Sequence, residues 1–139
     1  MSEVERFDFI LDAWAVFAHL ENEPGAERVR EILKSAANDE CTIGMSIINL
    51  GELAYITERE RGITWVHEVL ATIRSLPITT LPADEKVVLS AAHIKTNHRI
   101  SYADAFAAAT AKLWQGTLLT GDPEFKALDS SETVVEWLS

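Results

Sequence analysis

Short apolar runs alternate along the chain with stretches whose apolar residues recur at helical spacing. The runs predict buried strands at 7–11, 41–45, 78–81, 117–119 and 133–137. The stretches between them predict helices at 13–20, 24–36, 46–62, 65–75, 84–97 and 105–114. Strands and helices in this alternation indicate an α/β fold, with a parallel sheet covered by helices on both faces.

The stretch 100–125 combines two turns with two acids. Ser101 and Asp104 fit a capping box, in which a hydroxyl and an acid three residues later cap the start of a helix reciprocally. Gly116 is expected to end that helix in the left-handed conformation. Pro123 suits the first turn of another helix. The stretch therefore predicts a helix, a tight turn, a strand and a second turn.

Four acids are expected at one edge of the sheet. A helix that leads into a strand runs antiparallel to it, so Asp104 at the helix start and Asp122 after the strand lie near the same edge. Asp12 follows the first strand, and Glu52 is on the helix after the second. Ligands bind at this edge in open α/β sheets. Each acid also has a structural explanation, as a helix cap, a turn residue or, for Glu52, a surface side chain.

Four neighbouring carboxylates would repel one another, which raises some of their pKa values and costs stability. A divalent cation relieves that repulsion. Ligands that are all oxygen select hard ions, so Mg²⁺ or Mn²⁺ is expected rather than zinc. The four histidines form no zinc-binding motif, and each is expected on a helix face or the surface: His19, His67, His93 and His98.

Composition limits the setting in which the protein acts. A chain of 139 residues predicts one domain, 1–139. No apolar run is long enough to cross a bilayer, the acidic start is unlike a secretory signal, and the single cysteine forms no internal disulfide. We expect a soluble intracellular protein. Its net charge of −10 repels nucleic acid at long range, so contact with nucleic acid would be local or bridged by metal.

Four segments in order resemble a known family: ILDAWAV, SIINLGEL, SYADAFAAATA and LLTGDPEF. Together they are similar to the PIN domain, in particular to the VapC-type toxins of prokaryotic toxin–antitoxin pairs. The resemblance runs from Phe7 to Phe125. It implies a PIN-like α/β/α sandwich with a central, mostly parallel sheet of four to five strands.

The resemblance also assigns residues. It implies an acidic quartet that is both catalytic and metal-binding, formed by Asp12, Glu52, Asp104 and Asp122. Supporting roles fall on Asn49, Ser101 and Thr120. One position departs from the family, because Trp14 stands where many members have serine or threonine. Tryptophan cannot support the first acid or a water molecule as a hydroxyl would.

The resemblance implies a Mg²⁺- or Mn²⁺-dependent endoribonuclease, the toxin of a VapBC-type pair, acting on RNA in the cytoplasm. It further implies a homodimer and a VapB-type antitoxin, whose amphipathic segment lies in an apolar groove and places a basic side chain at the acids. The residues expected to line that groove are Trp14, Phe17, Leu20, Trp65 and Leu70.

Other functions stay open at this point. A catalytically silent PIN-like module that binds RNA or protein is one, although a complete quartet argues against it. A response-regulator receiver would need a paired acid near the end of the first strand and a lysine after the last. A haloacid-dehalogenase-like phosphatase would need an acid where Trp14 stands.

Overall fold

The computed structural model describes residues 5–128 and 133–138. One sheet has the strand order β3-β2-β1-β4-β5, and every pairing in it is parallel. The strands are β1 (Phe9–Leu11), β2 (Ile43–Ser46), β3 (Thr79–Leu81), β4 (Thr117–Thr120) and β5 (Val135–Trp137). The helices are α1 (Ala13–Leu20), α2 (Ala26–Ala37), α3 (Ile47–Arg61), α4 (Ile63–Ser75), α5 (Glu85–Asn97) and α6 (Tyr102–Leu113), with a 3₁₀ helix η1 (Pro123–Ala127).

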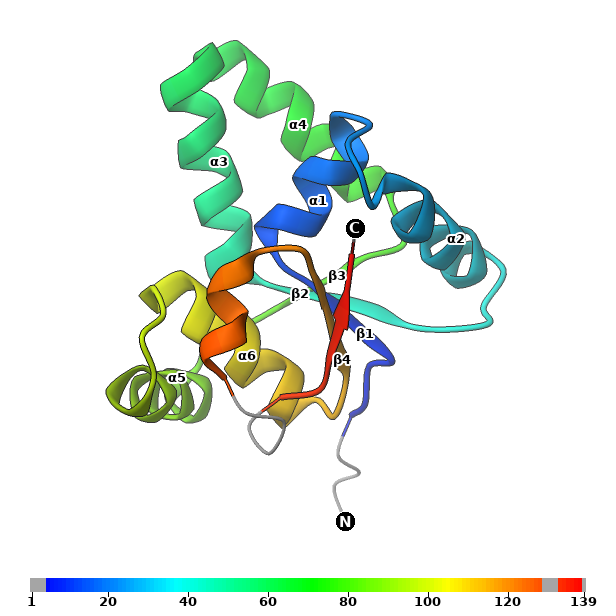
Figure 1. The fold of residues 1–139 in the computed structure, drawn as a ribbon. Helices are drawn as coiled ribbons and strands as arrows, with labels where there is room; N and C mark the ends of the chain where they lie inside the picture. The colour runs from blue at the N-terminus through cyan, green and yellow to red at the C-terminus, as the bar shows by residue number, and fades with distance from the viewer. Residues whose placement is uncertain (1–4, 129–132, 139) are drawn as a thin grey trace.

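Two apolar clusters cover the two faces of the sheet. Successive side chains on a strand point to opposite faces. Ile10 and Leu118 accordingly pack with α5 and α6, whereas Leu11 and Leu119 pack with α1 and α2. Figure 1 shows α5 and α6 on one side of the sheet, and α1 and α2 on the other. The predicted α/β/α sandwich with a parallel sheet is confirmed.

Helices α3 and α4 form a hairpin that reaches beyond the sheet (Figure 1). Leu53 and Ile73 attach the hairpin to the cluster under α1 and α2. Ile47, the first residue of α3, is 47% exposed. The reason is helical geometry, because Ile47 lies six residues before Leu53 and so about 240° around the helix from it.

The ends of several elements differ from the predicted ones. The first two strands begin two residues later than predicted, and β5 begins at Val135 instead of residue 133. Gly116 was expected in the left-handed conformation, but Gln115 has the positive φ of 55°. A Cβ on Gly116 would lie 2.6 Å from the backbone oxygen of Phe7. Glycine is therefore needed there for close approach of two backbones.

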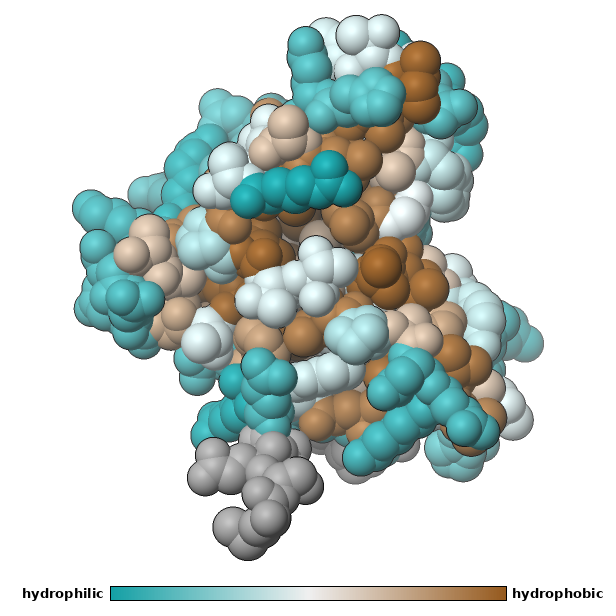
Figure 2. Space-filling view, turned by 180° about the vertical axis from the view of Figure 1, so that it is seen from behind, coloured by the Kyte–Doolittle hydropathy of each residue, from teal (hydrophilic) through white to brown (hydrophobic). Residues whose placement is uncertain are grey.

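Apolar side chains at the surface are dispersed. Seen from behind in Figure 2, they form several separate patches with hydrophilic side chains between them. The most exposed large ones are Ile47, Tyr55, Ile63, Trp65, Leu89, Tyr102, Val134 and Trp137. Within the described ranges, no helix is long and apolar enough to cross a membrane.

Candidate metal centre

Two acids follow neighbouring strands at the centre of the sheet. Asp12 comes directly after β1 and caps α1, where its Oδ1 accepts a 2.9 Å hydrogen bond from the Ala15 N–H. Asp122 lies two residues after β4 and caps η1, accepting a 2.9 Å hydrogen bond from the Glu124 N–H. Because β1 and β4 pair in parallel, their carboxyl ends meet, and both acids lie at the same edge.

The buried hydroxyl of Thr120 connects these two acids. Its Oγ1 donates a 2.6 Å hydrogen bond to Oδ2 of Asp12 and accepts a 3.0 Å hydrogen bond from the Asp122 N–H. Both oxygens of the Asp12 carboxylate are thus held in place. Thr120 was predicted in a supporting role because it precedes the last acid, and the hydrogen bonds are what such a role requires.

Asp104 reaches the same edge from the start of α6. Ser101 caps this helix, its Oγ accepting a 3.1 Å hydrogen bond from the Asp104 N–H. The reciprocal half of the predicted capping box is wrong, because the Ser101 N–H donates to Glu124 instead of Asp104. Because Glu124 accepts this hydrogen bond, the Asp104 carboxylate does not accept one from the Ser101 N–H.

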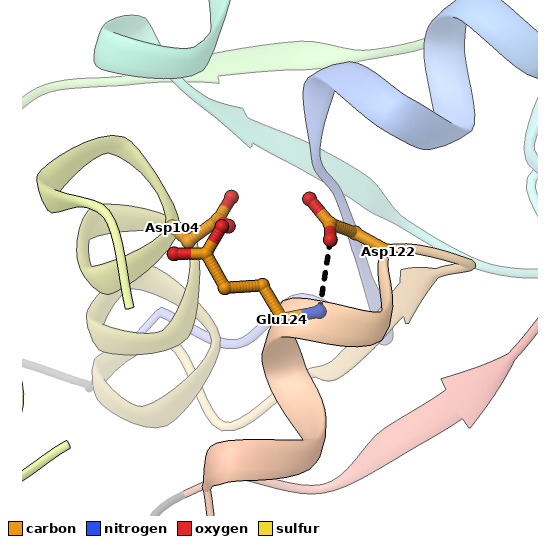
Figure 3. A group of neighbouring side chains, drawn as sticks. All are labelled: Asp104, Asp122 and Glu124. Carbon is orange, nitrogen blue, oxygen red and sulfur yellow. Dashed lines mark hydrogen bonds between the residues drawn. The ribbon is translucent and has the colours of Figure 1, made fainter. Parts of the chain in front are cut away.

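Glu124 joins Asp104 and Asp122 in one cluster. Each of the three residues offers a carboxylate oxygen that lies within 4.8 Å of the other two. Figure 3 shows the three carboxylates turned toward one another, from α6, from the turn after β4 and from η1. The sequence prediction missed Glu124. Its position two residues after Asp122, in the first turn of the next helix, was the available signal.

Glu52 lies on α3, beside this cluster, and is half-buried. Asn49 donates to it at 3.4 Å from Nδ2, and the same amide donates to the Ala103 backbone oxygen at 3.1 Å. Asn49 thus joins α3 to the start of α6. Its Oδ1 is buried and has no hydrogen-bond partner among the described residues.

Burial and mutual repulsion shift the protonation of this site. Burial raises the pKa of Asp12 to about 7, against the opposing effect of its hydrogen bonds to Thr120 and Ala15. The pKa of Asp104 is raised to about 8, mainly by burial and also by the charge of Asp122 and a hydrogen bond with Glu124. The pKa of Glu52 is also raised, mainly by burial. These acids hold protons that isolated carboxyl groups would release.

The donor set fits a hard divalent cation. Asp104, Asp122 and Glu124 present oxygen atoms alone, as Mg²⁺ and Mn²⁺ prefer. The unpartnered Oδ1 of Asn49 adds a neutral oxygen nearby. Asp12 and Glu52 are outside the tight group of three, but each is close enough to Asp122 for its charge to raise their pKa values.

A match to the PIN domain family covers residues 9–130. The chain belongs to that family, as its sequence motifs predicted. A search of curated proteins gives no match.

Solved structures share the fold at low sequence identity. VapBC2 from Rickettsia felis, bound to a fragment of its promoter DNA, has a TM-score of 0.73 at 20% identity, over 94% of this chain and 98% of that chain. VapC20 from Mycobacterium tuberculosis, a toxin that cleaves the sarcin–ricin loop, has a TM-score of 0.69 at 17% identity, over 95% and 100%. FitAcB from Neisseria gonorrhoeae has a TM-score of 0.58 at 25% identity, over 91% and 95%.

Proposed function

We propose that this PIN domain is a Mg²⁺- or Mn²⁺-dependent endoribonuclease, and the toxin of a VapBC-type pair. One observation carries the proposal: carboxylates from α6, from the turn after β4 and from η1 converge on one point, with oxygen atoms within 4.8 Å of one another. Family membership and the toxin–antitoxin structures of the same fold support it.

The proposed roles follow from the matching positions in the family, and not from the tight group of three carboxylates. Asp12 and Asp104 hold the cation directly, and Glu52 and Asp122 hold it directly or through water. Glu124 adds a fifth carboxylate beside Asp104 and Asp122. When bound, the cation supplies positive charge that lowers the pKa of an attacking water and stabilises the leaving 3′ oxygen of the phosphodiester.

The remaining groups position these acids. Thr120 holds Asp12 and the backbone of Asp122, and Asn49 holds Glu52. Ser101 holds the start of α6, from which Asp104 projects. The hydroxyls of Ser101 and Thr120 are engaged in these hydrogen bonds, so water is the proposed nucleophile, and hydrolysis leaves a 5′-phosphate on the released RNA.

Charge also favours a metal at this site. The protein carries a net charge of −10, and its acids would repel the anionic backbone of RNA. A divalent cation bridges an acidic cleft and a phosphate, because it attracts both. Two basic side chains that could have contacted RNA are engaged within the protein. Arg61 pairs with Glu21, and Lys95 donates to the backbone oxygen of Ile100.

A groove between α1, α3 and α4 suits the proposed antitoxin. Its cavity of about 180 Å³ combines apolar side chains with three acids and Arg61, so the excess of acids favours an amphipathic segment that carries positive charge. Of the five residues expected to line the groove, Phe17, Leu20 and Trp65 do so, whereas Trp14 and Leu70 are not among its lining residues. The VapB-type partner, the homodimer and the cytoplasmic location belong to the same proposal.

Asparagine variants test the catalytic role. Asp12→Asn and Asp104→Asn each remove one negative oxygen while keeping size and most hydrogen bonds. We expect RNA cleavage with Mg²⁺ or Mn²⁺ to fall at least about 100-fold in each, since each loses a metal contact. Asp84→Asn, which changes the cap of α5 away from the site, is the matched control. Sequencing the fragment ends checks for a 5′-phosphate.

Full activity in both variants would remove the quartet from the mechanism. Calorimetric titration of the wild-type protein separates the nuclease from the silent binding module. Absence of Mg²⁺ and Mn²⁺ binding would favour the module.

A further inference from the structure

Trp14 lies in the first turn of α1, two residues after Asp12, and its ring reaches across to the turn that follows β4. A Cβ built on Gly121 would lie 2.2 Å from Cη2 of the Trp14 ring, 2.4 Å from Cζ2 and 2.6 Å from Cζ3. Real Cβ atoms essentially never come this close to another atom. The six-membered ring of Trp14 therefore occupies the space that any side chain at position 121 would need.

Gly121 is glycine here for reasons of space. Its φ is not among the positive values found at Gly25 and Gly62, so other residues can adopt its backbone conformation. The three atoms nearest to a Cβ at this position all belong to the ring of Trp14. The pair Trp14–Gly121 is thus one contact between the turn that carries Asp12 and the turn that carries Asp122.

The contact lies next to residues of the proposed metal centre. Gly121 stands between Thr120, whose hydroxyl holds Asp12, and Asp122, which belongs to the cluster of three carboxylates. Any shift of Gly121 moves the carboxylate that follows it. Trp14 is half-buried and also packs against the apolar cluster of α1 and α2.

We propose that Trp14 is a positioning residue for the metal centre: its ring, seated on Gly121, sets the distance between the Asp12 turn and the Asp122 turn. This inference rests on the proposed function of that centre. In many relatives a hydroxyl residue stands at position 14 and can support the first acid. Here the Thr120 hydroxyl supports Asp12, and the Trp14 ring adds a steric contact between the Asp12 turn and Gly121 in the Asp122 turn.

Variants at the two positions test the contact through Mn²⁺ affinity, measured by calorimetric titration of folded protein. Trp14→Ala should weaken Mn²⁺ binding about tenfold or more, as is usual when support behind a ligand is lost. Trp14→Phe keeps a ring and should stay within about threefold of the wild type. Leu89→Ala removes an exposed apolar side chain from α5, outside the metal centre and the groove, and should leave the affinity unchanged.

Gly121→Ala provides the reciprocal test. Its methyl group displaces the ring, so it should weaken Mn²⁺ binding about as much as Trp14→Ala does. In the Trp14→Ala background the ring is gone and the methyl group has room. Adding Gly121→Ala should then reduce the Mn²⁺ affinity little further. The two effects are coupled in this way only if the residues act through their mutual contact.

Hydrogen exchange tests the contact without metal. The Asp122 and Glu124 amides, which donate to Thr120 and Asp122, should exchange faster in Trp14→Ala than in the wild type. The inference is overturned if Trp14→Ala keeps wild-type exchange rates and wild-type Mn²⁺ affinity, or if Gly121→Ala costs the same in both backgrounds. Failure of the wild-type protein to bind Mn²⁺ would instead overturn the proposed function.

Discussion

The hydroxyl of Thr120 donates a 2.6 Å hydrogen bond to the carboxylate of Asp12, 108 residues away in the sequence. Both groups are buried. The same oxygen accepts a hydrogen bond from the Asp122 N–H, so the hydroxyl proton points toward the Asp12 carboxylate. Pairing of β1 with β4 brings the two residues together, and the hydrogen bond then fixes Asp12 relative to the second acid.

Thr120→Val keeps the shape of the side chain and removes the hydroxyl. The hydrogen bond from Thr120 lowers the pKa of Asp12, so that pKa should rise further in the variant. At about pH 8 the free energy of unfolding should fall by about 1–3 kcal/mol, because a buried carboxylate and the Asp122 N–H lose their partner. Urea denaturation measures this, and Thr117→Val at the other end of β4 is the control. An unchanged stability would mean that the hydrogen bond is not formed in solution.

The stability of the metal-free protein should fall as pH rises from about 4 to about 8. The folded-state pKa values of Asp12 and Asp104, about 7 and about 8, lie above the ordinary value of 3.8. In this window the folded state binds protons that the unfolded state has released. The stability that protonated Asp12 and Asp104 contribute is therefore fully present below about pH 4, and it is lost as the pH rises through their folded-state pKa values. Urea denaturation in EDTA at several pH values checks the sign.

Asp104→Asn is the control for that pH dependence. The amide cannot titrate, so the slope of stability against pH should become shallower, most of all between about pH 5 and 7. A free energy of unfolding that increases from about pH 5 to 8 in the wild type would contradict the raised pKa values.

Mn²⁺ should bind more tightly, and stabilise the protein more, as pH rises. The cation needs carboxylates, so binding at neutral pH releases the protons held by Asp12 and Asp104. Each released proton increases the apparent affinity by up to about tenfold per pH unit. Calorimetry in two buffers with different ionisation enthalpies counts the protons directly. Proton uptake, or none, would contradict the expectation.

Two substitutions separate the roles of Glu124. Glu124→Gln keeps an oxygen that can accept from the Ser101 N–H but removes the charge beside Asp104. It should lower the pKa of Asp104 and weaken Mn²⁺ binding about tenfold, with little change in stability. Glu124→Ala should weaken binding similarly and also cost about 1 kcal/mol of stability, because the backbone N–H loses its cap. Equal Mn²⁺ affinity in the wild type and both variants would exclude Glu124 from the metal centre.

The sequence predicted the order of strands and helices because each strand is a short, mostly apolar run and several helices have a recognisable start. Ser46, Asp84 and Ser101 cap their helices in the structure as their residue types suggested. The convergence of Asp104 and Asp122 followed from the antiparallel path of a helix and the strand after it. Their assignment to metal binding stays a prediction.

Contacts between distant side chains could not be read in the same way. Glu124 was not among the predicted acids, and its hydrogen bond with the Ser101 N–H and its place in the cluster appear only in the structure. Trp14 was expected to line a groove, and its neighbour Gly121 is close only because β1 and β4 pair. Local patterns specify elements, but they do not specify which side chains meet across an edge.

The central place of β1 in the sheet has a consequence during protein synthesis. Its neighbour β4, with Thr120, Asp122 and Glu124 at or after its end, is made more than a hundred residues later. A nascent chain therefore carries Asp12 out of the ribosome long before the partners of that acid exist. A protein that cleaves RNA would in this way stay harmless to the ribosome that makes it until β4 and η1 have been made.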